Sequence, residues 1–165
     1  IDMKIYLSFF LKTFLIFSFL ISCDSSSGGD ELGPVDLFNI DNSLGVWVMN
    51  PLCEDYLLAG MTISLDEELP DSVNVEKVDE SNIFIMAGDN NIVASINNAG
   101  IFEIESQPFL AQVVLLGSLT DIPTNIQGNG YLNDSTGNID VIFSFENILS
   151  PGTIDSINCS IDLSR

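Results

Sequence analysis

The carboxyl-terminal stretch of the chain alternates apolar and polar residues with a period of two, which is typical of β-strands. Apolar side chains occupy one phase and polar side chains the other: Ile157, Cys159, Ile161 and Leu163 against Asn158, Ser160 and Asp162. Successive side chains of a strand point to opposite faces, so one phase faces a core and the other faces water. The same period recurs from residue 44 onward, between Gly, Asn, Asp and Ser turn signals at 97–100, 134–137 and 150–152.

This pattern predicts an all-β fold. Strands are expected at 44–50, 61–65, 73–78, 83–87, 92–96, 101–105, 112–119, 127–133, 139–146 and 157–163. Because the connections are short, we predict an antiparallel meander barrel of about eight or nine short strands, with a β-sandwich as the alternative. Residues 35–40 are apolar enough for a short turn of helix that plugs one end of the domain.

The amino-terminal segment has the composition of an export signal. Met3 is the expected start, Lys4 supplies a positive charge, and residues 5–22 are largely apolar around Lys12. The uninterrupted apolar core, residues 13–21, is too short to cross about 30 Å of hydrocarbon as a helix. We expect residues 1–22 to be a cleaved signal peptide. An uncleaved anchor, or a signal cut elsewhere, is the alternative.

Leu20-Ile21-Ser22-Cys23 ends this segment, and residues 3–23 resemble the signals of bacterial lipoproteins. The resemblance implies cleavage before Cys23 and a diacylglycerol thioether on its sulfur, usually with a third acyl chain, which anchors a protein stably in a bilayer. It implies a location in the bacterial cell envelope, for which we expect the outer membrane. Asp24 marks inner-membrane retention in some systems, and an acidic cluster here accompanies surface display in others. Residues 23–43 would form the lipidated, flexible tether.

Charge and histidine content exclude several classes of function. The chain carries 24 acidic residues, four cationic residues and no histidine, for a net charge of −20. This charge opposes binding to nucleic acids and anionic lipid headgroups. Ser–His–Asp and Cys–His catalysis both need the missing imidazole, and a zinc site would lack its usual nitrogen ligands. We therefore expect no enzymatic activity and no cofactor.

Carboxylates are the remaining candidates for chemistry. Paired carboxylates hydrolyse glycosides, but Glu103 and Glu105 fall on the outward phase of a strand, which favours a solvated face. Calcium needs six to eight converging oxygens, and the acidic clusters at 54–55, 66–71 and 89–91 match no EF-hand loop. The last cluster favours a hairpin turn. No catalytic residue and no metal site is predicted.

Two cysteines, Cys53 and Cys159, remain once Cys23 carries lipid. An even pair in an oxidising compartment favours a disulfide, and Cys159 shares the inward phase of its strand. The bridge would staple the start of the domain to its last strand. For a loop near 100 residues the chain-entropy model gives about 4.7 kcal/mol. Two free buried thiols are the alternative.

Gly45-Val46-Trp47 resembles the Gly-x-Trp signature of lipocalin-like proteins. The order of lipobox, polar tether, Gly-x-Trp strand and two cysteines also resembles the small lipocalin-like lipoprotein domains of bacteria. The resemblance covers most of residues 44–165, the expected lipocalin-like domain. It implies that Gly45 and Trp47 pack across the closed end of an eight-stranded barrel, with the Arg165 side chain over the tryptophan ring. A solvated Arg165 is the alternative.

These observations lead to three hypotheses. The first is a membrane-anchored envelope lipoprotein with a non-enzymatic barrel domain that binds a small apolar ligand or an envelope partner. A barrel of this size either holds one small ligand or is filled by its own side chains. Phe102, Phe109, Phe143 and Phe145 are large enough to fill it. The second hypothesis is therefore a structural or accessory lipoprotein with a filled core and no ligand, and an acid-based hydrolase is a distant third.

Overall fold

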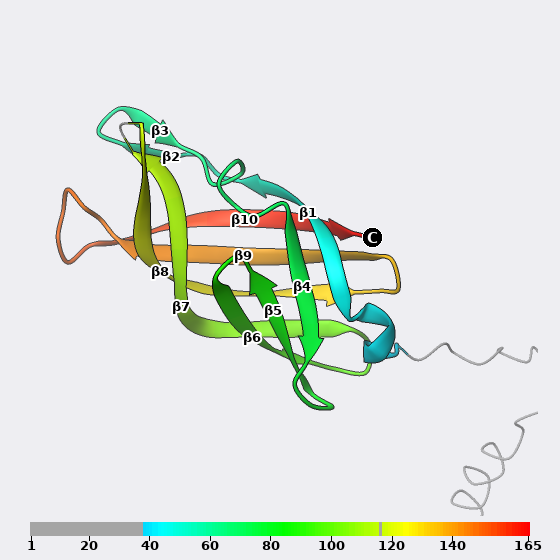
Figure 1. The fold of residues 1–165 in the computed structure, drawn as a ribbon. Coiled ribbons are helices and arrows are strands. Elements are labelled where there is room, and N and C mark those ends of the chain that lie inside the picture. Colours follow the sequence, from blue (N-terminus) through cyan, green and yellow to red (C-terminus); the bar gives the residue numbers. More distant parts are fainter. Residues whose placement is uncertain (1–37, 116) are drawn as a thin grey trace, which may run out of the picture. The chain divides into compact units, whose positions relative to one another are not determined.

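The computed structural model describes residues 38–115 and 117–165, which form an all-β fold (Figure 1). A 3₁₀ turn, η1 (Ile40–Ser43), precedes ten strands: β1 (Gly45–Cys53), β2 (Tyr56–Leu58), β3 (Met61–Ile63), β4 (Ser72–Lys77), β5 (Asn82–Ala87), β6 (Asn90–Ile96), β7 (Ile101–Leu115), β8 (Ser118–Leu132), β9 (Thr136–Glu146) and β10 (Ile154–Ser164). Eight strands close into an antiparallel barrel in the order β1-β10-β9-β8-β7-β6-β5-β4, and β4 pairs with β1 again. The predicted fold class is confirmed.

The barrel is a meander from β4 to β10, and β1 closes it by pairing with both β10 and β4. The long connection from β1 to β4 contains the β2–β3 hairpin, which forms a two-stranded sheet of its own. In Figure 1 this hairpin lies at one end of the barrel, and η1 and the carboxyl terminus lie at the other. The two ends are therefore closed by different parts of the chain.

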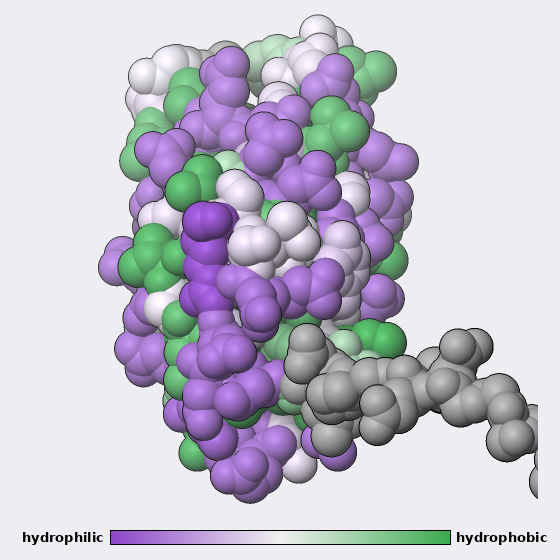
Figure 2. Space-filling view, turned by 90° about the vertical axis from the view of Figure 1, so that its right-hand side faces the viewer, coloured by the Kyte–Doolittle hydropathy of each residue, from purple (hydrophilic) through white to green (hydrophobic). Residues whose placement is uncertain are grey.

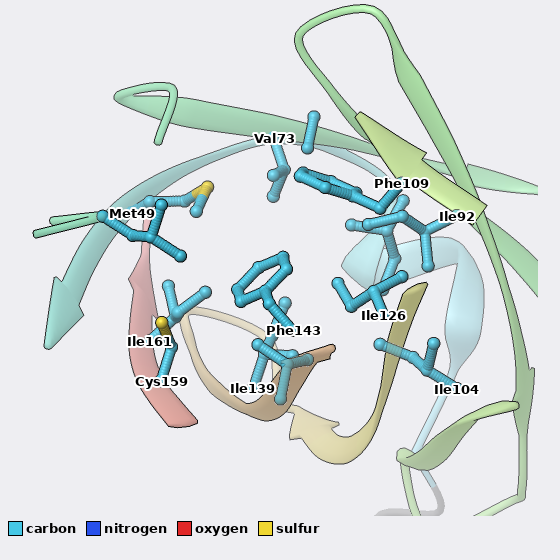
Figure 3. Close-up of a cluster of buried hydrophobic side chains, with 14 of the residues drawn as sticks. Met49, Val73, Ile92, Ile104, Phe109, Ile126, Ile139, Phe143, Cys159 and Ile161 are labelled. Atoms are coloured by element: carbon cyan, nitrogen blue, oxygen red, sulfur yellow. The ribbon is translucent and has the colours of Figure 1, made fainter. Parts of the chain in front are cut away.

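Alternate residues of every barrel strand fill the interior, as β10 illustrates. Ile157, Cys159 and Ile161 are buried, whereas Asn158 and Ser160 between them are exposed. The close-up in Figure 3 shows the apolar side chains of opposite walls meeting around two phenylalanine rings. Among the described residues, only two polar residues are buried, Ser43 and Thr124, so the described interior contains no ionisable side chain.

The connection between β7 and β8 differs from the prediction. A single strand was expected over 112–119, but Leu115 pairs with Ser118 across a two-residue turn. Gly117 adopts a φ of +80° there, which an L residue rarely tolerates. Apolar residues continue on both sides of the turn, so the period-two pattern runs through it. The two strands it joins have 15 residues each and are long rather than short.

The folded domain begins before residue 44. Phe38 and Ile40, which the sequence analysis assigns to the tether, pack against the core, and Asp41 forms an ion pair with Lys77 of β4 at 3.4 Å. The expected helical turn is present as η1, at Ile40–Ser43 rather than 35–40. Residues 35–37 lie outside the described residues.

Strands β6 and β7 are joined by an incomplete ladder. They share only two residue pairs, at the end of β6, because β7 carries a bulge after Ile104 and bends away. Farther along, side-chain amides bridge the two strands. Asn90 of β6 accepts from the backbone N–H of Leu110 at 2.8 Å and donates to its carbonyl at 3.1 Å. We call this the amide-bridged seam.

Candidate functional site

The η1 end of the barrel is sealed around Trp47. Its side chain is fully buried, and its indole N–H donates to the carbonyl of Ser43 at 2.9 Å. Gly45, at the head of the same strand, adopts a φ of +109°, so glycine is the residue suited to this position. The structure thus places both residues of the Gly-x-Trp signature at a barrel end.

Arg165 completes this seal. The centre of its guanidinium lies 4.5 Å from the ring centroid of Trp47, a cation–π distance. The guanidinium also donates to the carbonyls of Leu44 and Asp134, at 2.8 Å each. The structure brings the predicted pair together, and the arginine also bonds to two backbone carbonyls.

The β2–β3 hairpin covers the opposite end. Leu58 and Ile63 are its buried residues, and the ring of Tyr56 meets that of Phe145 edge-on at 5.0 Å. The Tyr56 hydroxyl donates to the carboxylate of Asp155 at 2.5 Å. This hydrogen bond is the main reason that the pKa of Tyr56 is raised, with burial and the charge of Asp155 adding to it. The hairpin is therefore fastened by apolar and polar contacts.

The two apolar cavities inside the barrel are too small for a ligand, and a larger hollow of about 280 Å³ lies between the β3–β4 connection, the β5–β6 turn and β7. One of these apolar cavities lies beneath the hairpin and the other deeper in the barrel, and each measures about 20 Å³. A volume of this size is about that of one water molecule, whereas pockets for small ligands measure several hundred Å³. The rings of Phe109 and Phe143 lie in the centre of the core, with their centroids 5.1 Å apart (Figure 3). The core is filled by its own side chains.

The predicted disulfide is present. Cys53 of β1 and Cys159 of β10 lie directly opposite each other in the ladder and are bonded, 106 residues apart in sequence. The bond therefore holds the first and last barrel strands together where the barrel closes. The backbone N–H of Cys53 also donates to the carboxylate of Asp66, which holds the following connection against β1.

A much larger hollow lies on the outer surface. An open groove of about 1230 Å³ crosses six strands on the outside of the barrel. One row of its lining residues lies in direct cross-strand register: Ser95, Glu103, Asn129, Asp140, Ser160 and Leu52. A parallel row is formed by Glu105, Gln127, Ile142, Asn158 and Glu54. We call this the outer groove. No pattern in the sequence predicts this groove.

Hydrogen bonds fix two carboxylates of the outer groove. The Ser160 hydroxyl donates to Asp140 at 2.6 Å, and the Asn158 amide donates to Glu54 at 2.7 Å. Glu103 and Glu105 are exposed, as predicted for their outward phase. Across 38–115 and 117–165, no three acidic or cysteine side chains are grouped in a way that could hold a metal ion.

The face that carries η1 and the carboxyl terminus is largely hydrophilic, with apolar residues scattered among the polar ones (Figure 2). The predicted lipidation residue, Cys23, lies outside the described residues. Within the described part of the chain, no helix has the length and hydropathy needed to cross a membrane.

Comparison with known proteins gave no match, whether to a protein-family model, a curated protein or a solved structure. The fold defines the class of the domain, an eight-stranded antiparallel β-barrel with a disulfide between its first and last strands.

Proposed function

We propose that this chain is a lipid-anchored protein of the bacterial cell envelope, with a non-enzymatic, lipocalin-like barrel that binds an envelope partner through its outer surface. The anchor is the acylated Cys23, for which the apolar segment and Leu20-Ile21-Ser22 provide the support. The contact between Trp47 and Arg165 and the positive φ of Gly45 support the lipocalin-like interpretation. No bound cofactor is part of the proposal.

The observation that carries the proposal is the filled interior. Two apolar cavities of about 20 Å³ each cannot hold a fatty acid or a comparable apolar molecule, whereas the outer groove has about 1230 Å³ of open space. A scaffold with a closed core and a hollow outer face is suited to recognition of another macromolecule. Among our three hypotheses, this favours a partner-binding lipoprotein.

The anchor can be tested with the full chain expressed in a bacterium that is fed an alkyne-labelled palmitate. We expect the wild-type protein to carry the label and to sediment with membranes, because the lipid is attached to the Cys23 thiol. Cys23→Ser should lose both properties. Label retained by Cys23→Ser, or absent from the wild type, would show that the anchor is wrong.

The interior can be tested separately with a fluorescent fatty acid and the purified domain, residues 24–165. A filled core predicts no saturable fluorescence change and no apolar molecule retained in native mass spectrometry. Stoichiometric uptake would mean that the β2–β3 hairpin moves aside and that the barrel carries an apolar ligand. In that case the first hypothesis, a ligand in the interior, would replace the present one.

A further inference from the structure

The outer groove exists because the sheet bends sharply beneath it. The bulge after Ile104 bends β7, and β8 approaches β9 so closely that a Cβ at Gly128 would lie 2.1 Å from the carbonyl oxygen of Asp140. Bulges and strand glycines often mark places where a sheet turns a corner or where a ligand approaches the backbone. Here both features lie in the lining of the outer groove.

The groove has the length of a short extended peptide. Its first row crosses six strands, which at about 4.8 Å between neighbouring strands gives roughly 24 Å. An extended chain of about seven residues covers that distance at roughly 3.3 Å per residue. Exposed apolar side chains, Leu52 and Ile101, lie near its two ends.

The charge of the lining is of one sign. Glu54, Glu103, Glu105 and Asp140 line the groove, and no lysine or arginine does. Within the described residues the carboxylates of Glu103 and Glu105 form no hydrogen bond or ion pair, and the two described cations are engaged elsewhere on the barrel. No counter-charge for the groove comes from the described protein itself.

This charge decides which occupant fits. A second copy of the chain, with a net charge of −20, would be repelled, as would nucleic acid or an anionic membrane. The one aromatic residue of the lining, Phe102, is buried with 1% of its surface exposed, so the lining offers no ring on which a base could stack. A cationic, extended polypeptide fits both the length and the charge.

We propose that the outer groove binds an extended, lysine- or arginine-rich segment of a partner protein, with its cations over Glu103, Glu105 and Asp140. Asp140 and Glu54 are held in position by their hydrogen bonds, while the two glutamates of β7 are free to close on the cations. This inference rests on the proposed function, since it gives the chemistry of the partner that the outer surface would bind.

The test uses the purified domain and a fluorescent eight-residue peptide of alternating lysine and serine, with blocked ends, at low ionic strength. We expect saturable binding that weakens as salt is added, because exposed ion pairs are screened. Glu103→Gln/Glu105→Gln should weaken binding about tenfold, since two exposed pairs are lost. The matched control, Glu67→Gln/Glu76→Gln, removes the same charge from exposed positions outside the groove and should change affinity less than about twofold.

An equal loss of peptide affinity in the two double variants would show that the peptide is attracted by the general charge of the domain and not by the groove. Absence of saturable binding to the wild type would also overturn the inference. Circular dichroism of both variants checks that the fold is retained. A photocrosslinking residue placed at Glu105, and in a second variant at Glu76, separates this inference from the proposed function. A partner crosslinked in cells only from the Glu76 position would contradict binding in the outer groove, but it would still agree with a lipoprotein that binds a partner through its outer surface.

Discussion

The side-chain amide of Gln107 makes the two hydrogen bonds to the backbone of Val93 that a neighbouring strand usually makes. It accepts from the backbone N–H of Val93 at 2.9 Å and donates to the backbone carbonyl at 2.8 Å. The side-chain amide of Asn90 in β6 makes the same two hydrogen bonds to the backbone N–H and carbonyl of Leu110 in β7. Two side-chain amides thus bond to backbone groups of the amide-bridged seam where β6 and β7 do not pair with each other through their backbones.

We predict that Gln107→Ala lowers the free energy of unfolding by about 1 kcal/mol, the usual net value of such hydrogen bonds, because water replaces the amide at this exposed site. The Val93 amide should then exchange its hydrogen faster, which NMR-detected hydrogen exchange can measure. Gln127→Ala, on an exposed amide of β8 without a hydrogen bond to the described protein, is the control and should change neither quantity. Unchanged protection of Val93 would show that the seam does not depend on Gln107.

Reduction of the Cys53–Cys159 disulfide should destabilise the barrel strongly. Because the bond joins strands 106 residues apart, its loss should cost about 3–5 kcal/mol in the unfolding free energy. Urea titrations with and without reductant measure this cost, and intact mass measures the two hydrogens gained. A Cys53→Ala/Cys159→Ala variant should not respond to reductant. A wild-type midpoint that is the same in both conditions would contradict the prediction.

Arg165→Gln should loosen the η1 end. It removes the contact with Trp47 and charge-assisted hydrogen bonds to two carbonyls, together worth about 1–3 kcal/mol. Trp47 is the only tryptophan of the chain, so its fluorescence reports directly on exposure of this end. Lys77→Gln breaks exposed ion pairs only and should have a much smaller effect. Equal effects of the two variants would argue against a seal.

The raised pKa of Tyr56 predicts a loss of stability in alkaline solution. The folded state holds the phenol proton more tightly than the unfolded chain does, because of Asp155. This contribution is fully present below the unfolded pKa of about 10 and is lost as the pH rises through the folded pKa. The unfolding free energy of the wild type should therefore fall more steeply above pH 10 than that of Tyr56→Phe. Equal slopes in the wild type and Tyr56→Phe would show that the contact with Asp155 does not hold the phenol proton in the folded state.

The sequence predicted those features that follow from local pattern. The alternation around Cys159 placed the last strand and the inward direction of its thiol, and the cysteine pairing followed from their number. The turn at Gly117 was missed because one glycine within an apolar run is a weak signal. The outer groove could not be predicted, since it depends on which residues face one another across strands. Glu103 and Asp140 share a row only through the register of β7, β8 and β9.

The position of β1 has a consequence for the order of folding. Its two neighbours, β4 and β10, lie far apart along the chain, and the second of them ends at Ser164. A polypeptide is made from its amino terminus, so β1 must remain an open edge on one side until nearly the whole domain has been synthesised. Open edges invite pairing with other chains, and contacts this distant in sequence form slowly. Chaperone protection during biogenesis should therefore matter most for the strand that is made first.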